Sequence, residues 1–189
     1  MRRLLLIAAA LIPLSVLPAR AEPIALGVWY EFVHQGPGTL VNPCGSGIMC
    51  VPSSDGNTTY APVQPWTVWL NAPGTLTITD AFASGDQFEG LSNGQPLGLT
   101  SPTIPFQHCG DNPENCINAF GMSSGVFALS AGSNLLTIRT VASQVGSGAA
   151  YFRVDAPAVV PEPSSLILLG SGLYLVRRLR QRTSTARQS

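Results

Sequence analysis

The chain has 189 residues, and its formal net charge of zero hides a strong asymmetry. All ten basic residues are arginines, and only Arg139 and Arg153 lie between positions 22 and 160. The same stretch holds nine carboxylates, so its formal charge is about −7. Because phosphate binding needs clustered lysine or arginine, this composition argues against nucleic acid as a partner.

The first residues have the order of a secretory signal peptide. A basic start at 1–3 is followed by an apolar stretch at 4–17 and by the small-x-small step Ala19-Arg20-Ala21. This pattern predicts a signal peptide at 1–21, with the exported chain beginning near Glu22. A retained membrane anchor is the alternative, although Pro13 and Pro18 argue against a long permanent helix.

The pattern between residues 22 and 158 is β throughout. Alternating, β-branched and aromatic runs predict seven or eight short strands with glycine and proline at the turns. Asn93-Gly94 is a turn signal for a hairpin, and 130–133 is expected to join two strands. We therefore predict one exported all-β domain over 22–158, an antiparallel β-sandwich of which the jelly roll is one form. The predicted strands lie at 24–33, 66–70, 74–79, 87–91, 95–99, 126–129, 134–141 and 150–154, and long loops are expected at 35–64 and 101–120.

Four cysteines form two close pairs in loop-like stretches. In an oxidising compartment this spacing favours the local disulfides Cys44–Cys50 and Cys109–Cys116, although four cysteines allow three pairings. Zinc is the competing interpretation, because His108 precedes Cys109. The spacings differ from the usual two-residue zinc knuckles, and export favours disulfides.

Three acids, Asp80, Asp86 and Glu89, cluster around a predicted turn. Carboxylates and loop carbonyls could bind Ca²⁺, which prefers six to eight oxygen ligands. A second interpretation is a solvated turn in which aspartate caps backbone groups. A third is a glycosidase pair, which needs two carboxyl groups about 5–10 Å apart across a cleft. Apart from Ca²⁺, the sequence indicates no cofactor.

The tryptophans are the candidates for stacking on sugar rings, and they are Trp29, Trp66 and Trp69. Trp66 and Trp69 are three residues apart, so in a strand they face opposite sides of the sheet. At most one of the two can then be in the core while the other is exposed. Burial as a structural side chain is the alternative for each of them.

The last thirty residues combine three features in a fixed order. Pro161, Glu162 and Pro163 hold an extended peptide, an apolar segment follows, and arginines end it on the cytoplasmic side. From Ser164 to Val176 the segment would span roughly 20 Å as a helix, against a hydrocarbon core of about 30 Å. The apolar residues are Leu166, Ile167, Leu168, Leu169, Leu173, Tyr174, Leu175 and Val176, and the basic stop is Arg177, Arg178, Arg180 and Arg182.

These residues resemble the PEP-CTERM sorting signal of Gram-negative bacteria, which would occupy 159–189 here. The resemblance implies recognition by a membrane-embedded exosortase, a precursor held in the inner membrane by a C-terminal hydrophobic helix, and delivery to the cell surface or extracellular matrix. The segments 66–94 and 125–155 are also similar to exported β-sandwich modules.

From these features we expect a non-catalytic structural or adhesive protein that binds extracellular polysaccharide. A glycan-active hydrolase using Asp80, Asp86 or Glu89 is the alternative. Only two histidines, His34 and His108, are present.

Overall fold

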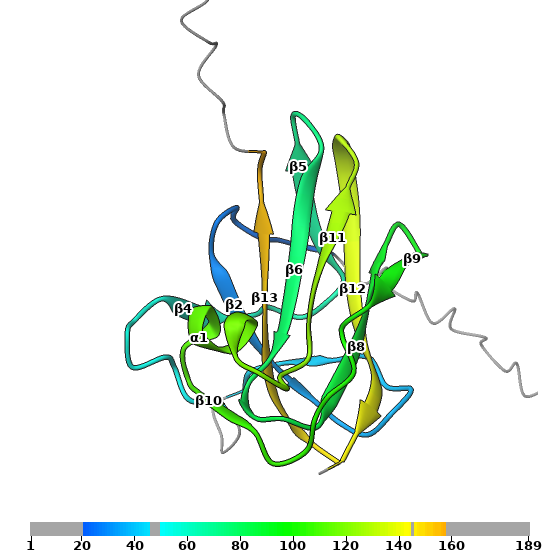
Figure 1. The fold of residues 1–189 in the computed structure, drawn as a ribbon. Helices are drawn as coiled ribbons and strands as arrows, with labels where there is room; N and C mark the ends of the chain where they lie inside the picture. The colour runs from blue at the N-terminus through cyan, green and yellow to red at the C-terminus, as the bar shows by residue number, and fades with distance from the viewer. Residues whose placement is uncertain (1–20, 46–49, 145, 158–189) are drawn as a thin grey trace, which may run out of the picture. The chain divides into compact units, whose positions relative to one another are not determined.

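The computed structural model describes residues 21–45, 50–144 and 146–157. The predicted signal peptide and the predicted sorting segment lie almost wholly outside these residues. Within the described part, strands dominate and a single short helix is present (Figure 1), so the all-β prediction is confirmed. No helix in these ranges is long and apolar enough to cross a membrane.

The described residues form thirteen strands and one helix. In order they are β1 (Glu22–Pro23), β2 (Trp29–His34), β3 (Asn42–Pro43), β4 (Thr58–Tyr60), β5 (Trp66–Leu70), β6 (Gly74–Asp80), β7 (Phe82–Ala83), β8 (Asp86–Ser92), β9 (Gln95–Leu99), β10 (His108–Gly110), α1 (Pro113–Asn118), β11 (Ser124–Leu129), β12 (Gly132–Ser143) and β13 (Gly148–Asp155).

Two large sheets and one small sheet contain these strands. The five-stranded sheet has the order β1-β5-β12-β8-β9, and the six-stranded sheet has the order β11-β6-β13-β2-β3, with β4 added beside β2. A two-stranded sheet pairs β10 with β7. Most pairs are antiparallel, but β1 with β5 and β2 with β4 are parallel. The prediction of purely antiparallel pairing is therefore wrong at these two edges, where the added strands have only two or three residues.

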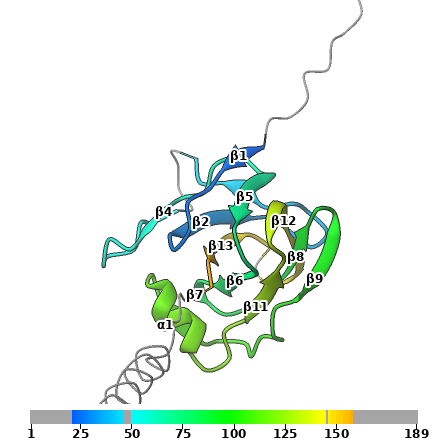
Figure 2. The same ribbon diagram turned by 90° about the horizontal axis from the view of Figure 1, so that it is seen from above.

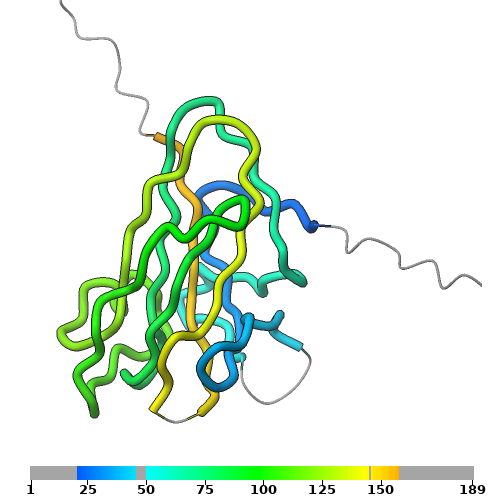
Figure 3. The backbone as a smooth tube through the Cα atoms, turned by 90° about the vertical axis from the view of Figure 1, so that its right-hand side faces the viewer, coloured from blue at the N-terminus to red at the C-terminus, as the bar shows by residue number. Residues whose placement is uncertain are grey.

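Two short connections run directly from one large sheet to the other. The 71–73 connection joins β5 of the five-stranded sheet to β6 of the six-stranded sheet, and residues 130–131 join β11 to β12 in the reverse sense. Both connections lie at the same end of the strands (Figure 3). The turn expected at 130–133 does join two strands, but they belong to different sheets.

The hairpin predicted around Asn93-Gly94 is present. Strands β8 and β9 pair with Ser92 opposite Gln95. Asn93 has φ 52° and Gly94 has φ 77°. These positive values are those that a type I′ turn requires, and asparagine and glycine are the residues that accept them most readily.

One hydrophobic core receives side chains from both large sheets. Trp66 of β5 stacks on Phe152 of β13, with ring centroids 4.3 Å apart. Phe32 of β2 meets Phe88 of β8 edge to face at 5.5 Å. Each of these four rings is fully buried. Burying such a side chain contributes about 1.5–3 kcal/mol, so these contacts are a principal source of adhesion between the sheets.

A second, smaller core lies on the outer face of the six-stranded sheet, under α1 (Figure 2). Its buried members are Trp29, Ala81, Cys116 and Tyr151. The Asn112 side chain accepts the Glu114 N–H and caps the helix. The sequence predicts a loop at 101–120. The helix has only six residues, too few to show a helical hydrophobic period.

Candidate functional site

Asp80 is the best-buried of the three predicted acidic site residues. It ends β6, is fully buried, and its carboxylate accepts three backbone N–H groups, from Ala81 and Gly85 and from Asp86. Burial raises the pKa of Asp80 to about 7, the nearby Asp86 charge adds to this effect, and the three N–H donors oppose it. Asp80 therefore caps the turn, as one interpretation expects, but the turn is not solvated.

Asp86 lies beside a residue that the sequence did not connect with it. Its Oδ2 is 3.0 Å from Nε2 of His34, and both side chains are almost completely buried. His34 ends β2 and Asp86 begins β8, so this pair joins the six-stranded sheet to the five-stranded sheet. The signal available in the sequence is the alternation of Tyr30, Phe32 and His34. It places the histidine on the inward face, where a polar ring needs a partner.

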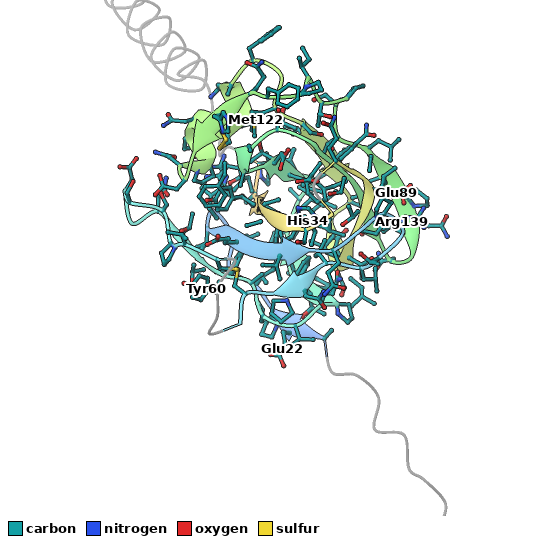
Figure 4. The ribbon with its side chains drawn as sticks, turned by 90° about the horizontal axis from the view of Figure 1, so that it is seen from below. Glu22, His34, Tyr60, Glu89, Met122 and Arg139 are labelled. Atoms are coloured by element: carbon teal, nitrogen blue, oxygen red, sulfur yellow. A yellow bond between two sulfur atoms is a disulfide. The ribbon has the colours of Figure 1, made fainter. Side chains whose placement is uncertain are left out.

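Glu89 points the other way. It follows Asp86 by three positions on the same strand, so its side chain is on the opposite face of the sheet. There it forms an ion pair with Arg139, its register partner on β12. Figure 4 shows Glu89 and Arg139 together at the edge of the view, apart from His34. The structure thus does not bring Glu89 together with Asp80 and Asp86.

This placement bears on the predicted metal site. Among the residues that the structure describes, the one group of three ligating side chains with donor atoms within 4.8 Å of one another is Glu31, Cys44 and Cys50. Asp80, Asp86 and Glu89 do not form such a group. The two sulfurs of the first group are joined in a disulfide, which leaves them no thiolate for a metal.

The three tryptophans have different surroundings. Trp66 is fully buried in the main core and Trp29 is 3 % exposed in the second core, whereas Trp69 is 67 % exposed. Trp66 and Trp69 therefore face opposite sides of β5, as their spacing predicts. Trp29 and Trp66 are structural side chains, and only Trp69 is placed to contact a ligand in solution.

Trp69 lies on the outer face of the five-stranded sheet. Ser133 is directly opposite it on β12, and Leu135 is the next outward residue along that strand. The indole N–H donates a hydrogen bond to Oδ1 of Asn71. Leu135 is itself 38 % exposed. We call Thr67, Trp69, Ser133, Leu135 and Thr137, which share this side of β5 and β12, the Trp69 face.

Trp29 belongs to a polar network at the border of the second core. Its indole N–H donates to Oε1 of Glu114, and the guanidinium of Arg153 lies 4.5 Å from its ring centroid. Arg153 also pairs with Glu114 at 2.5 Å and with Asp155 at 2.8 Å. The hydrogen bond from Trp29 is the main cause that lowers the pKa of Glu114, and Arg153 adds to it.

Both expected disulfides are present in the structure: Cys44 is bonded to Cys50, and Cys109 to Cys116. Their surroundings differ. Cys116 is fully buried in the second core, whereas Cys44 and Cys50 are half-buried. The buried Glu31 lies beside the Cys44–Cys50 pair, and no local sequence pattern indicates this contact, because Glu31 precedes Cys44 by thirteen positions.

The sorting motif Pro161–Pro163, the apolar segment and the basic stop all lie outside the described residues. Their roles remain the sequence-based predictions given above. No protein-family model, no curated protein and no solved structure matches this chain.

Proposed function

We propose that this protein is an exported, non-catalytic adhesive or structural module that binds neutral polysaccharide through the Trp69 face. The observation that carries the proposal is the exposure of Trp69, at 67 %, on a regular strand in the described part. A large exposed aromatic ring presents a surface that matches the C–H face of a sugar ring.

The neighbours of Trp69 suit this role. Ser133 and Thr137 supply hydroxyl groups on the same face, and Leu135 extends the apolar surface. Because Asn71 accepts the indole N–H, the orientation of the ring is restrained before a ligand arrives. Such restraint lowers the entropic cost of binding. The negative charge of the exported region disfavours acidic polysaccharides, so the proposed ligand is a neutral glycan.

The positions of the carboxylates favour binding over hydrolysis. A glycosidase needs two carboxyl groups that face one substrate. Asp80 directs its oxygens to backbone N–H groups, Asp86 lies against His34 in the interior, and Glu89 pairs with Arg139 on the opposite face of β8. These side chains already have intramolecular partners, which supports a stabilising role for them.

We also propose a β-sandwich architecture with a jelly-roll-like path for this domain. Two observations support it: both large sheets contribute to one core, and the connections 71–73 and 130–131 cross between the sheets at the same end. A rigid sandwich suits an adhesive module because it presents one flat sheet face to a ligand.

The proposed route to the surface is export by the signal peptide at 1–21, followed by exosortase processing at the Pro161–Pro163 motif. The two disulfides suit an oxidising compartment. Intact mass of the protein from cells and from the medium, with and without an exosortase, tests this route. A mature form that begins near Glu22 and lacks the tail only when the protease is present supports it. A full-length tail in both strains contradicts it.

Glycan binding is tested with the full-length protein in detergent and neutral hexasaccharides of glucose, N-acetylglucosamine and mannose. Isothermal titration gives the dissociation constants. Trp69→Ala is expected to weaken binding by about tenfold or more, because stacking contributes on the order of 1 kcal/mol beyond the buried area. Phe106→Ala is the matched control, since Phe106 is a second exposed aromatic, at 90 %, outside the Trp69 face.

The proposal is wrong if no hexasaccharide binds the wild-type protein. It is also wrong if the two variants lose affinity equally, because a general contribution of exposed aromatics would then explain the binding. Thermal unfolding of both variants checks that the fold is retained.

A further inference from the structure

A buried carboxylate lies against one of the two disulfides. The Sγ atoms of Cys44 and Cys50 and a carboxylate oxygen of Glu31 are all within 4.8 Å of one another. Glu31 is on β2 and is fully buried. Its Oε1 accepts the N–H of Val51, the residue after Cys50, at 3.1 Å. The carboxyl group is therefore fixed to the end of the disulfide-closed segment.

The other carboxylate oxygen has no partner among the residues that the structure describes. Within these residues, Oε2 of Glu31 is buried without a hydrogen bond. Both arginines of the described part are paired elsewhere, Arg139 with Glu89, and Arg153 with Glu114 and Asp155. A buried carboxylate without a cation or a full set of donors is costly in its charged form.

The charged and titratable groups that face Glu31 also disfavour its ionisation. Asp111 adds a like charge, and Tyr151, the register partner of Glu31 on β13, presents a neutral phenol. The Tyr151 hydroxyl donates its hydrogen bond to the Asp111 carbonyl oxygen and so does not donate one to Glu31. Burial, chiefly, raises the pKa of Glu31 to about 7, while the Val51 N–H opposes the rise. Glu31 can therefore hold a proton next to the disulfide near neutral pH.

A purely structural disulfide does not need this arrangement. Glutamine would accept the same Val51 N–H without the desolvation cost of an acid. The second disulfide shows the contrast: Cys116 is fully buried with Trp29, Ala81 and Tyr151. Among the described residues, no carboxylate lies as close to the sulfurs of Cys109 and Cys116 as Glu31 lies to those of Cys44 and Cys50. The two disulfides thus have similar ring sizes, with sequence separations of 6 and 7, but different chemistry around the sulfurs.

We propose that Cys44–Cys50 is a thiol–disulfide exchange site in which Glu31 gives its proton to the departing sulfur. The co-reactant is a thiolate, from a small thiol or from a cysteine of another molecule. It attacks one sulfur of the disulfide and forms a mixed disulfide with it. The S–S bond breaks, its electron pair goes to the other sulfur, and that sulfur takes the proton of Glu31.

The products of this step are one mixed disulfide, one cysteine thiol and the Glu31 carboxylate. No external oxidant is needed, because the electrons of the incoming thiolate account for the reduction of the departing sulfur. In the reverse direction the Glu31 carboxylate takes the proton from the thiol and regenerates the nucleophilic thiolate. The half-buried position of Cys44 and Cys50 leaves a path for the incoming sulfur.

The test follows the reduction of both disulfides in the full-length oxidised protein in detergent. Dithiothreitol is the probe, over pH 5 to 9. Samples are quenched with acid, alkylated and mapped by mass spectrometry, so that each disulfide has its own rate. Each rate is divided by the concentration of dithiothreitol thiolate at that pH, which removes the ionisation of the reductant from the comparison.

The normalised rate for Cys44–Cys50 is expected to fall as pH rises through about 7, by roughly 10²-fold or more, as Glu31 loses its proton. The rate for Cys109–Cys116 is expected to show no fall in this range. In Glu31→Gln, the fall for Cys44–Cys50 should disappear, and its rate at pH 5.5 should drop toward the rate of the wild type at pH 9.

The Cys109–Cys116 rate in the same variant reports whether the fold is intact, because Cys116 is fully buried in the second core. The wild-type profile decides the question even if Glu31→Gln does not fold. A normalised rate for Cys44–Cys50 that is independent of pH, or that changes in parallel with that of Cys109–Cys116, overturns the proposal.

Discussion

His34 and Asp86 meet in the interior between the two large sheets, with Nε2 and Oδ2 3.0 Å apart. Each belongs to a different sheet, and 52 positions of sequence separate them. Gly148 closes the site from β13, since a Cβ at that position would lie 2.6 Å from Nε2 of His34. The pair is therefore a buried polar contact between the two large sheets.

Removing one partner of this pair is expected to be costly. Asp86→Asn leaves the imidazole buried without its carboxylate, and breaking such a pair costs about 3–5 kcal/mol in the free energy of unfolding. Urea unfolding measures the loss. Glu89→Gln is the control on the same strand, because its partner Arg139 is half-exposed, and a loss below about 1 kcal/mol is expected there. Equal losses in the two variants would contradict the assignment of the inter-sheet pair.

The local elements of the fold were predictable because short-range chemistry determines them. The Asn93-Gly94 turn follows from positive φ values, and the opposite placement of Trp66 and Trp69 follows from the two-residue period of a strand. Close cysteine spacing favours local disulfides, and both expected pairs are present.

The long-range relationships were not predictable from one sequence. The segment from Asp80 to Asp86 has the composition of a solvated turn, and nothing local shows that neighbouring strands cover it. His34 pairs with Asp86, and Glu31 lies beside Cys44, only because β2 is placed against segments that are distant in the chain. The order of the strands in the sheets creates these contacts, and that order cannot be read from the composition of any one segment. Helix α1 escaped prediction because its six residues read as a loop rich in proline and asparagine.

The pH dependence of stability is expected to reveal Glu31. In the unfolded chain its pKa is near 4.5, and in the folded protein burial raises it to about 7. Between these values the folded state binds more protons than the unfolded state, so stability falls as pH rises through this window. The slope is at most about 1.4 kcal/mol per pH unit for one group, and the loss is complete above pH 7.

The measurement is the free energy of unfolding in urea at several values from pH 4.5 to pH 8, for the wild type and for Glu31→Gln. Asp80 has a pKa raised to about 7 by burial and contributes in the same direction in both proteins. The stability of the wild type relative to Glu31→Gln should therefore decrease from pH 4.5 to pH 7 and then stay constant. A difference that does not change with pH would show that Glu31 ionises freely in the folded protein.

The two arginines of the described part provide a second matched comparison. Arg153 pairs with Glu114 and Asp155 and covers the ring of Trp29, whereas Arg139 pairs with Glu89 alone. Arg153→Ala is expected to lower the free energy of unfolding by about 1–3 kcal/mol, and Arg139→Ala by less than about 1 kcal/mol.

Arg153→Lys separates charge from geometry at this position. Lysine keeps the positive charge, but it lacks the planar guanidinium that contacts Glu114, Asp155 and the Trp29 ring. The free energy of unfolding is therefore expected to lie between those of the wild type and Arg153→Ala. Trp29 fluorescence should shift in both Arg153 variants and not in Arg139→Ala. If Arg139→Ala is as damaging as Arg153→Ala, the network around Trp29 is not the source of the stability.

Gly74 is expected to be the glycine at which an added methyl group is most harmful. It begins β6, and a Cβ there would lie 2.4 Å from the carbonyl oxygen of Asp155 on β13 and 3.1 Å from Leu70 Cδ1. The first contact is with backbone, which cannot rotate away as a side chain can. Thr75 pairs with Asp155 in the β6–β13 ladder, so relief of the clash must separate the two strands at this end.

Gly74→Ala should therefore lower the free energy of unfolding by about 1–3 kcal/mol or more, the range for an overpacked site. Gly36→Ala is the control, because the nearest atom to its Cβ would be 4.0 Å away, and its expected change is within about 1 kcal/mol in either direction. Hydrogen exchange should locate the damage at the paired ends of β6 and β13, while the β8–β9 hairpin keeps its protection. Equal stability of the two variants would mean that β6 and β13 do not approach this closely in solution, and the close contact at Gly74 would have to be abandoned.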